Sequence, residues 1–341
     1  MRDLVVAGGG PVGLATALLA ARAGLDVVVH EPRRGPVDKA CGEGLMPGAV
    51  VGLRELGVEL RGRPIAGIRY VDGKRSVDAP FRHGAGMGVR RTTLHSALSE
   101  AVAAAGVEVD DVPVKDVQDR GDHVLVDGIP ARFMIAADGL HSPTRRTLGL
   151  EGTSRMPRRY AQRAHAAIEP WTDFVEVHWA PSGEAYVTPT ADGQVGVAIL
   201  TRQRGRDFHD LLADHPRLAE RLDGASWGRV RGAGPLRQRS TARVRGNVFL
   251  VGDAAGYIDA LTGEGIALGL AQAKAAIAAV VDGSPQRYER DWRRVTWQHD
   301  LMTAGLVTAT RASFVRTGIV PAAQRLPSVF GWAVDQLARP A

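Results

Sequence analysis

An apolar segment that runs directly into closely spaced glycines opens the chain. Residues 4–7 are Leu-Val-Val-Ala, and Gly8, Gly10 and Gly13 follow at the one-three-six spacing of dinucleotide-binding turns. Gly8 permits a sharp turn after the strand, Gly10 lets the backbone approach a phosphate, and Gly13 allows the next helix to pack closely. The N–H groups and the positive dipole end of that helix favour an anion. The sequence therefore predicts a pyrophosphate site at its start.

The next residues complete a strand-helix-strand unit. Residues 12–22 carry an apolar face at helical spacing, Gly24 ends that helix, and residues 25–30 form a second buried parallel strand. Glu31 lies eighteen residues after Gly13, where a carboxylate can accept hydrogen bonds from both ribose hydroxyls of an adenosine. An acidic residue there argues against a 2′-phosphate on this nucleotide. The alternative is an unrelated glycine turn between a strand and a helix.

Composition narrows the class of protein. With 341 residues, of which 45% are hydrophobic, the chain can form one large or two modest domains. Its net charge is +6, but only four of the 43 basic residues are lysines and the arginines are scattered, so no nucleic-acid partner is expected. Cys41 is the only cysteine, which excludes an internal disulfide and a zinc site built on several thiolates, and no metal site is predicted. The first residues show no export signal, which predicts a cytoplasmic protein.

The pattern of elements changes near residue 150. Helical segments and short strands alternate before that point, whereas residues 158–200 contain strand-like runs separated by proline and glycine turns. The predicted strands are 163–169, 174–179, 184–188 and 194–200. From residue 247 the earlier pattern returns, with a buried strand over 248–251 and an alanine-rich helix over 264–281. These patterns predict an antiparallel sheet inserted into an α/β domain that resumes after the interruption.

Residues 296–338 mix apolar side chains with widely spaced arginines, as amphipathic helices do. Such helices either pack on their own domain or lie on a membrane surface, and both interpretations stay open. No stretch of eighteen apolar residues occurs in the chain, so no segment is expected to span a bilayer. Peripheral membrane contact through the last helices is therefore the alternative to a purely cytoplasmic location.

Two further motifs follow the opening glycines. In the first, over residues 134–145, a strand ends in Asp138-Gly139. In the second, residues 251–256 read Val-Gly-Asp-Ala-Ala-Gly and residues 262–266 read Thr-Gly-Glu-Gly-Ile. Together the three motifs resemble the flavin-binding signatures of an FAD-dependent oxidoreductase superfamily. This superfamily contains aromatic hydroxylases of the p-hydroxybenzoate hydroxylase type, flavin halogenases and geranylgeranyl reductases.

The resemblance covers roughly residues 1–290 and implies an α/β fold with FAD as the cofactor. The implied architecture is a discontinuous Rossmann-like FAD-binding domain of the glutathione reductase type, an inserted antiparallel β-sheet domain that binds substrate, and C-terminal helices. The predicted boundaries are 1–70, 85–155 and 240–290 for the FAD-binding domain, 71–84 and 156–239 for the substrate domain, and 291–341 for the helical segment.

The same resemblance implies roles for single residues. Asp253 would bond the ribityl chain, and the helix start at residues 263–266 would direct N–H groups at N1 and the C2 carbonyl of the flavin. Arg91, rather than Arg90, would lie near the FAD phosphates; the alternative is a solvated arginine at a helix start. The predicted cofactor-binding residues are Gly8, Gly10, Pro11, Val12, Gly13, Glu31, Pro32, Arg33, Cys41, Arg91, Asp138, Gly139, Gly252, Asp253, Gly263, Gly265 and Ile266.

The reductant is less clearly marked in the sequence. In the family the motif at Asp138-Gly139 contacts FAD and a transiently docked nicotinamide, and Arg145 would be a phosphate partner; the alternative is an ordinary turn after a strand. The chain has no second complete glycine-acid unit that could bind a pyridine nucleotide on its own domain. NADH or NADPH would therefore reduce the flavin by transient contact, or a separate electron donor would do so.

Residues 38–45 discriminate between the branches of this superfamily. They read Asp-Lys-Ala-Cys-Gly-Glu-Gly-Leu and resemble the Lys-x-Cys-Gly loop of geranylgeranyl reductases. Cys41 would then pack on the flavin, donate a weak hydrogen bond or supply a proton to a reduced alkene. The alternative is a small buried residue without chemistry. Glu43 stands where these reductases often have glycine, and the short substrate domain leaves less room for a long prenyl chain, so both features depart from the reductase pattern.

Hydroxylation is the other interpretation. In that branch reduced flavin reacts with molecular oxygen to give a C4a-hydroperoxide, while the protein positions the substrate, excludes water and accepts a phenol proton. Candidates on the inserted sheet are Arg163, His165, His178 and Tyr186, although a histidine in a sheet commonly has no such role. The Trp-x-Trp-x-Ile motif of flavin halogenases is absent, which argues against halogenation.

Three functional hypotheses result, in the following order. The first is a flavin monooxygenase, reduced by NADH or NADPH, that hydroxylates a lipophilic or aromatic secondary metabolite. The second is a geranylgeranyl-reductase-like enzyme that saturates alkene bonds of a prenyl or polyketide substrate, and the third is an FAD-binding protein without catalysis. The predicted catalytic residues are Cys41, Glu43, His165 and Tyr186.

Overall fold

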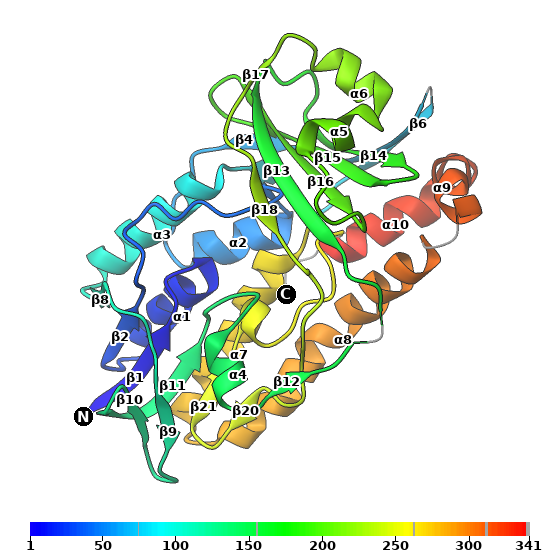
Figure 1. Ribbon diagram of the computed structural model, residues 1–341. Coiled ribbons are helices and arrows are strands. Elements are labelled where there is room, and N and C mark those ends of the chain that lie inside the picture. The colour runs from blue at the N-terminus through cyan, green and yellow to red at the C-terminus, as the bar shows by residue number, and fades with distance from the viewer. Residues whose placement is uncertain (74, 155, 262, 311–312, 339–341) are drawn as a thin grey trace.

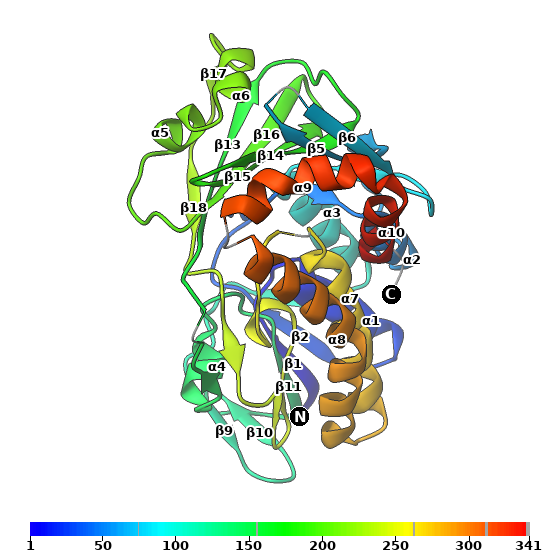
Figure 2. The same cartoon turned by 90° about the vertical axis from the view of Figure 1, so that its right-hand side faces the viewer.

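A computed structural model describes the chain apart from residues 74, 155, 262, 311–312 and 339–341. The described chain forms two lobes, each built on a β-sheet (Figure 1). The last helices run along one side of the molecule and reach both lobes (Figure 2). The α/β class predicted from the sequence is confirmed.

The first sheet, in the lower lobe of Figure 1, has the strand order β20-β21-β11-β1-β2-β8. β1 runs parallel to both neighbours, with Leu4 opposite Val27 on one side and Phe133 on the other. Residues 4–7 are all buried, as expected for a parallel strand covered on both faces. The strands are β1 (Arg2–Ala7), β2 (Val27–His30), β8 (Glu108–Asp110), β11 (Ile129–Ala136), β20 (Val244–Arg245) and β21 (Val248–Leu250), and the hairpin of β9 (Val117–Asp119) and β10 (Val124–Val126) extends β11.

The predicted strand-helix-strand unit is formed by β1, α1 (Pro11–Arg22) and β2. α1 begins one residue earlier, and β2 two residues later, than the sequence indicated. α1 packs against α3 (Arg91–Ala104) and α7 (Gly265–Val281). α7 follows β21 and the short helix η1 (Gly252–Ala254), so a segment from late in the chain completes both the first sheet and its helical layer. The predicted return of the α/β domain after an interruption is confirmed.

The second sheet, in the upper lobe, has the order β17-β13-β16-β15-β14-β5-β6, with β18 beside β13. All four strands predicted from the turn pattern are present, and each neighbouring pair among them is antiparallel. Their bounds are β13 (Tyr160–Ala167), β14 (Phe174–Ala180), β15 (Gly183–Thr190) and β16 (Gln194–Thr201). The remaining strands are β5 (Gly67–Asp72), β6 (Arg75–Pro80), β17 (Ser226–Trp227) and β18 (Arg231–Ala233).

One pairing in this sheet differs from the rest. β14 runs parallel to β5, with Phe174 opposite Gly67 and His178 opposite Val71. β5 and β6 form a hairpin that reaches the sheet from early in the chain, so a long crossover rather than a tight turn sets its direction. β5 also continues through residue 70, so the boundary predicted there falls inside a strand. The other domain boundaries stay predictions.

Shorter elements connect and cover the two lobes. A small sheet joins β3 (Gly44–Leu45), β7 (Gly86–Gly88) and β4 (Arg63–Ile65), and β12 (Glu151–Gly152) pairs with β19 (Arg239–Ser240). α2 (Pro47–Glu55) packs on α7, and α5 (Phe208–Ala213) packs on β16 beside α6 (Pro216–Arg221). α4 (Pro143–Thr147) follows the Asp138-Gly139 turn.

The segment predicted to be helical at the end of the chain forms α8 (Pro285–Ala309), α9 (Ser313–Arg325) and α10 (Pro327–Ala338). α8 packs along α7, whereas α9 and α10 pack against β6 of the second sheet. Val320, Phe330 and Val334 are buried in these contacts, so the helices do pack on their own molecule. Among the described residues, no helix combines the length and the apolar character needed to cross a membrane.

Candidate functional site

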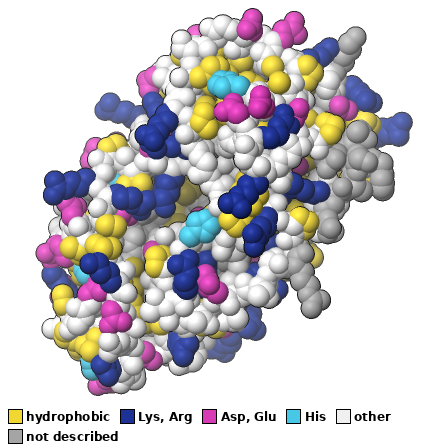
Figure 3. Space-filling model, viewed as in Figure 1, with side chains coloured by type: hydrophobic (Ala, Val, Ile, Leu, Met, Phe, Trp, Pro, Cys, Tyr) yellow, Lys and Arg dark blue, Asp and Glu magenta, His cyan; other side chains and the backbone are white. Residues whose placement is uncertain are grey.

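A cavity of about 810 Å³ is lined by residues of both lobes. Its walls come from the β1–α1 turn, the loop over residues 38–46, the segment over residues 251–266 and one face of the second sheet. Figure 3 shows the surface hollowed between the lobes, with Lys and Arg side chains around the hollow. The cavity thus brings together the three motifs identified in the sequence, although these lie far apart along the chain.

The β1–α1 turn is packed so closely that it requires its glycines. Gly8 has a φ of +103°, and a Cβ there would lie 2.6 Å from the Ala137 carbonyl oxygen. A Cβ at Gly13 would overlap the Gly8 carbonyl oxygen. The residue before α1 has no side chain to cap the helix, so the first N–H groups of α1 are available to an anion. The residues of this turn that line the cavity are Gly10, Pro11 and Val12.

Glu31 follows β2, and the protein itself already engages its buried carboxylate. Its oxygens accept hydrogen bonds from the Gly9 N–H at 2.9 Å and from the Arg33 N–H at 3.0 Å. The Arg33 guanidinium donates two more, at 2.7 and 2.6 Å. Burial opposes ionisation, but these hydrogen bonds hold the pKa of Glu31 below its ordinary value. The ribose predicted to bind here would share the Glu31 carboxylate with Arg33. Pro32, which lies between Glu31 and Arg33 in the sequence, is exposed.

Three cationic side chains line the cavity near this turn: Arg33, Lys39 and Arg91. Arg91 is buried at the start of α3, and its Nε has no hydrogen-bond partner within the described chain. Burial lowers the pKa of Arg91 and of Lys39, and neighbouring guanidinium groups lower both further. Arg90 does not line the cavity. Arg33 and Lys39 are exposed and Arg33 pairs with Glu31, so Arg91 is the buried charge of the three, and no carboxylate pairs with its side chain among the described residues. A buried guanidinium of this kind indicates that an anion is its partner.

The segment after β21 supplies the opposite wall. Asp253 lies in η1, and burial raises the pKa of its carboxyl while Lys39 and Arg91 oppose that rise. The N–H of Gly252, whose φ is +59°, donates to the Gln272 side-chain oxygen at 2.7 Å and ties η1 to α7. Residues of the α7 start that line the cavity are Gly263, Gly265 and Ile266. Thr262, part of the same sequence motif, lies outside the described residues.

The Asp138-Gly139 turn also lines the cavity. One oxygen of Asp138 accepts the Thr144 N–H at 3.0 Å, and the other is buried without a partner among the described residues. Arg145, predicted to hold a phosphate, is fully buried and donates to the carbonyl oxygens of Leu140 and Ala254, each at 2.9 Å. Its guanidinium therefore joins two segments of the first lobe, and the structure does not present it to a ligand.

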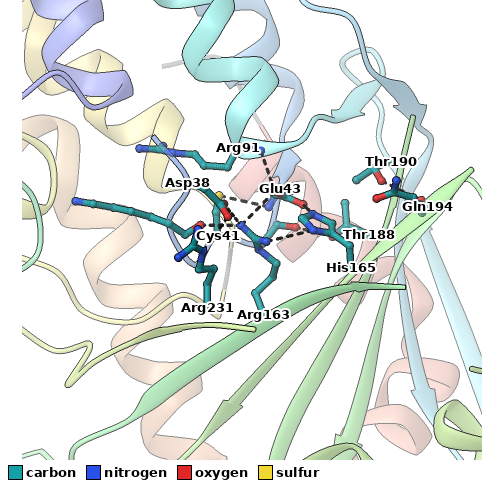
Figure 4. Close-up of polar contacts among 12 residues, drawn as sticks. Asp38, Cys41, Glu43, Arg91, Arg163, His165, Thr188, Thr190, Gln194 and Arg231 are labelled. Carbon is teal, nitrogen blue, oxygen red and sulfur yellow. Dashed lines mark hydrogen bonds and ion pairs between the residues drawn. The ribbon is translucent and has the colours of Figure 1, made fainter. Parts of the chain in front are cut away.

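The loop over residues 38–43 is tied to the second sheet by side chains of β13 and β15 (Figure 4). His165 Nε2 lies 2.6 Å from a Glu43 carboxylate oxygen, and Arg163 Nη1 lies 3.2 Å from His165 Nδ1. Arg163 also pairs with Asp38 and donates to the Lys39 carbonyl oxygen at 3.0 Å. A further contact is the Thr188 hydroxyl donating to the Gly42 carbonyl oxygen at 2.7 Å. The loop is thus held between the lobes by a buried polar network.

Glu43 shows why this position can depart from glycine. Its φ is +58°, in the left-handed region that glycine adopts without strain. In return, its carboxylate accepts the Arg91 N–H at 2.8 Å, pairs with His165 and lies 3.7 Å from Arg163. The glutamate thus fixes the loop and the start of α3 together, at the cost of a strained backbone.

Cys41 lines the cavity with a half-buried side chain. Its sulfur accepts a hydrogen bond from the Glu43 N–H at 3.4 Å. Burial raises the pKa of the Cys41 thiol, although the Arg91 charge opposes this effect. The thiol is therefore neutral near pH 7 and carries a proton that it can donate. Within the described part of the chain, no group of His, Cys, Asp and Glu side chains is arranged to hold a metal ion.

Tyr186 stands apart from this network. It lines the cavity, but its hydroxyl donates to the Leu261 carbonyl oxygen at 3.0 Å, and burial raises its pKa well above the ordinary value. His178 does not line the cavity and pairs with Glu176 at 3.0 Å. The structure therefore brings Cys41, Glu43 and His165 together and leaves Tyr186 and His178 elsewhere.

Comparison with known proteins identifies the family. A family model described as an FAD binding domain matches residues 1–207. The chain belongs to this FAD-binding family. It is 30% identical to the menaquinone reductase of Mycolicibacterium smegmatis, over 92% of this chain and 84% of that protein. It is 28% identical to a digeranylgeranylglycerophospholipid reductase of Methanopyrus kandleri, over 77% of this chain and 73% of that protein.

Two solved structures with the same fold are described as a flavoprotein and a flavin-dependent enzyme. A flavin-dependent halogenase superposes with a TM-score of 0.81 at 21% identity, covering 100% of this chain and 74% of the halogenase. A flavoprotein described as a dehydrogenase, from Cytophaga hutchinsonii, superposes with a TM-score of 0.79 at 22% identity, covering 90% and 85%. At these identities the likeness concerns the fold alone. The family and its reductase relatives show that this FAD-binding protein is an FAD-dependent oxidoreductase.

The cavity of this FAD-binding family member fits its cofactor. The free N–H groups of α1 and the unpartnered Nε of the buried Arg91 suit a pyrophosphate, as does the absence of a side chain at Gly10, where a Cβ would lie 3.8 Å from Arg91 Nη2. Asp253, at the cavity wall, would hold the ribityl hydroxyls, and the start of α7 would face the flavin ring. FAD supplies two-electron chemistry when it is bound.

Several cavity residues were not predicted from the sequence. Asp38 and Arg231, whose side chains pair with a 2.9 Å contact, belong to the network that holds the loop. Leu306, Val334 and Leu337 line the cavity from α8 and α10. The amphipathic spacing of the tail indicated buried faces there, but only the packing shows which cavity they border. Arg231 had no signal of its own among the scattered arginines of this FAD-binding chain.

Proposed function

We propose that this protein is an FAD-dependent reductase that saturates a carbon–carbon double bond in a lipophilic, isoprenoid-type substrate. The observation that carries the proposal is the position of Cys41, a neutral thiol on the wall of a cavity that has an apolar end away from the flavin motifs. The names of the two relatives, a menaquinone reductase and a digeranylgeranylglycerophospholipid reductase, support the same reaction class.

The substrate end of the cavity is lined by aliphatic and aromatic side chains. These residues, which we call the apolar end, are Ile65, Ile68, Tyr70, Phe81, Val175, Val177, Leu200, Leu261, Leu306, Val334 and Leu337. Burial of a hydrocarbon chain against such a surface contributes about 0.8 kcal/mol per methylene. Burial raises the pKa of Tyr70 to about 12, so the ring stays neutral in this surrounding. A chain of isoprene units is the kind of substrate that this surface favours.

Reduction of an alkene adds a hydride to one carbon and a proton to the other. FAD, when bound, would supply the hydride. Cys41 would donate the proton from Sγ, and solvent would restore the thiol. The Glu43 carboxylate and the His165 imidazole would hold the loop that carries this thiol, because they join it to β13. NADH or NADPH would provide the electrons by transient contact, or a separate electron donor would.

Hydroxylation with molecular oxygen, placed first from the sequence, stays the alternative. That reaction on a phenol needs a free proton acceptor beside the substrate. Both ring nitrogens of His165 are engaged, by Glu43 and by Arg163, and the Tyr186 hydroxyl already donates to the Leu261 carbonyl oxygen. These contacts favour the reductase over the hydroxylase.

An anaerobic single-turnover experiment tests the proposal. The purified FAD-bound protein is photoreduced without oxygen and mixed with menaquinone or a geranylgeranyl lipid, and flavin absorbance and product mass are followed. We expect flavin reoxidation and a product heavier by two hydrogen atoms. Cys41→Ala should slow that step by about 100-fold or more without loss of bound FAD.

The same reduced protein, mixed with air-saturated buffer and a candidate phenol, tests hydroxylation. A product heavier by one oxygen atom, together with no anaerobic reoxidation by the alkenes, would overturn the reductase proposal.

Loss of Cys41 should also change the pH profile of turnover. Since burial raises the thiol pKa, wild-type turnover should stay level through neutral pH and fall only above the ordinary thiol range near about 8.5. Cys41→Ser should lack that alkaline fall.

A further inference from the structure

Large apolar side chains are exposed on the last three helices. On α8, Trp297 and Leu301 are 60% and 67% exposed, and they lie one turn apart on the same face. Between the end of α9 and the middle of α10, Leu326, Val329 and Trp332 are each 56% exposed. We call these five residues the tail surface. Scattered exposed apolar residues are ordinary, but a concentration with two tryptophans on neighbouring helices indicates a contact surface.

The helices that carry the tail surface also form a wall of the cavity. Leu306 of α8 and Val334 and Leu337 of α10 line its apolar end. Near Trp297, the Gln298 side chain donates to the Gln336 side chain of α10 at 3.2 Å, so the two helices meet there. Figure 2 shows α8, α9 and α10 along one side of the molecule. The same pair of helices is therefore apolar toward the cavity and apolar toward solvent.

Positive charge accompanies the tail surface. Arg290, Arg293 and Arg294 are exposed on α8, within two turns of Trp297. Arg293 lies 3.5 Å from Glu289, whereas no acidic side chain of the described residues pairs with Arg290 or Arg294. Arg325 adds an exposed charge beside Leu326. Tryptophan and leucine flanked by unpaired arginines match an anionic lipid surface, where rings occupy the interface and arginines contact phosphates.

We propose that the tail surface docks this protein on an anionic lipid bilayer, and that a membrane-dissolved substrate chain reaches the cavity past α8 and α10. The second part rests on the proposed function, because it assumes a lipophilic substrate. A second copy of this chain would also cover apolar residues. Unpaired arginines around the patch favour lipid phosphates over an identical, equally basic surface, which would repel them.

Vesicle flotation tests the docking with the FAD-bound full chain. The vesicles contain either phosphatidylcholine alone or an equal mixture with phosphatidylglycerol. We expect binding to the anionic vesicles, and a triple variant, Trp297→Ser, Leu301→Ser and Trp332→Ser, should reduce the partition coefficient by roughly tenfold or more. Val109→Ser with Ile129→Ser, which removes exposed apolar side chains from the first lobe, is the matched control and should bind normally.

A variant without two of the arginines separates the electrostatic contribution to vesicle binding from the contribution of the apolar side chains. Arg290→Gln with Arg294→Gln should lower binding to the anionic vesicles by about fivefold per arginine and leave binding to phosphatidylcholine unchanged. The triple variant should turn over substrate dissolved in detergent as the wild type does, but act slowly on substrate held in vesicles. Equal vesicle binding by the triple variant and the wild type would overturn the proposal, as would absence of wild-type binding.

Two further outcomes are informative. If light scattering shows a dimer that the triple variant converts to a monomer, while vesicle binding is absent or unchanged, the tail surface joins two copies and the lipid proposal is wrong. Docking does not require catalysis, so Cys41→Ala should still float with anionic vesicles. If vesicles are bound but no alkene is reduced, the proposed function fails and the docking stands.

Discussion

The part of the cavity formed by the flavin motifs, at residues 8–13, 138–139 and 251–266, is called the cradle here. The cradle and the apolar end of the cavity differ in where their residues come from in the sequence. The cradle, which holds the flavin motifs, depends on backbone conformations within short contiguous segments, such as the turn from Gly8 to Gly13. The apolar end instead collects single side chains from β5, β14, β16, α8 and α10. Each of these elements contributes one or two side chains, and none of them contains a recognisable motif.

This difference predicts different tolerance to substitution. In the cradle, a methyl group added at Gly8 or Gly13 meets backbone atoms that cannot move aside. At the apolar end, side chains can be exchanged for others of similar volume. Such substitutions can alter which substrate fits the cavity without altering the cofactor site. Between the two lies the loop over residues 38–43, whose buried network depends on both lobes.

The largest effect is expected in the cradle, at Gly13. Gly13→Ala places a Cβ against the Gly8 carbonyl oxygen, so α1 must move away from β1. We expect loss of bound FAD and destabilisation by more than about 4 kcal/mol. Flavin absorbance and urea unfolding of the purified variant measure both. Gly305→Ala in α8, where a Cβ would meet nothing within 4 Å, is the control and should retain FAD. A Gly13→Ala protein with full FAD content would show that the cradle is not rigid.

The loop between the two ends should respond almost as strongly. Glu43→Ala leaves His165 buried without its carboxylate and removes one of the two carboxylates near Arg163, which should cost about 3 kcal/mol. Glu43→Gly removes the same carboxylate but relieves the strain of a φ of +58°, so it should lose about 1 kcal/mol less. Urea unfolding of both variants measures the difference. Asp192→Gly, at an exposed position with a φ of +67°, tests the backbone contribution alone and should stabilise the protein slightly. Equal losses of unfolding free energy in Glu43→Ala and Glu43→Gly would show that backbone strain at this position does not affect stability.

Acid should act on the second lobe through His215, a buried residue that precedes α6. Burial, with the nearby His178 charge, lowers the pKa of His215 from 6.5 to about 4. The unfolded chain therefore binds a proton that the folded chain does not, and stability falls as pH drops below about 6.5. This group should cost about 2 kcal/mol between about pH 7.5 and pH 5. His215→Gln should reduce that slope in urea unfolding, whereas His209→Gln, on the exposed side of α5, should preserve it. An unchanged slope in His215→Gln would contradict the assignment.

The smallest effect is expected at Tyr186, a cavity residue that is hydrogen-bonded to Leu261 of the apolar end. Tyr186→Phe removes only the hydrogen bond to the Leu261 carbonyl oxygen and retains the ring, so stability should fall by about 1 kcal/mol. Turnover should stay within about threefold of wild type if Tyr186 is a wall residue rather than a proton carrier. Steady-state kinetics with the substrate found by single turnover measure this. A loss of 100-fold would restore Tyr186 to the catalytic residues.

The cradle was accessible to sequence reasoning because its physics is local. A strand, a helix start and glycines within about six residues determine the turn, whatever the rest of the chain does. The four strands predicted for the second sheet were also accessible, because the proline and glycine turns between them mark where each strand begins and ends. Arg145 marks the limit of this reasoning: its position in a flavin motif suggested a phosphate, but burial against carbonyl oxygens from two segments assigned it to the scaffold.

The sequence alone determined the FAD-binding class, the interruption by a second sheet and the amphipathic character of the tail, because each rests on spacing along the chain. Tertiary structure decided that Glu43 and His165 share a hydrogen bond, that β14 pairs in parallel with β5, and that α8 and α10 border the cavity. These relations join residues that are distant in sequence. Their geometry depends on how two sheets and three helices pack, and no local pattern encodes that packing.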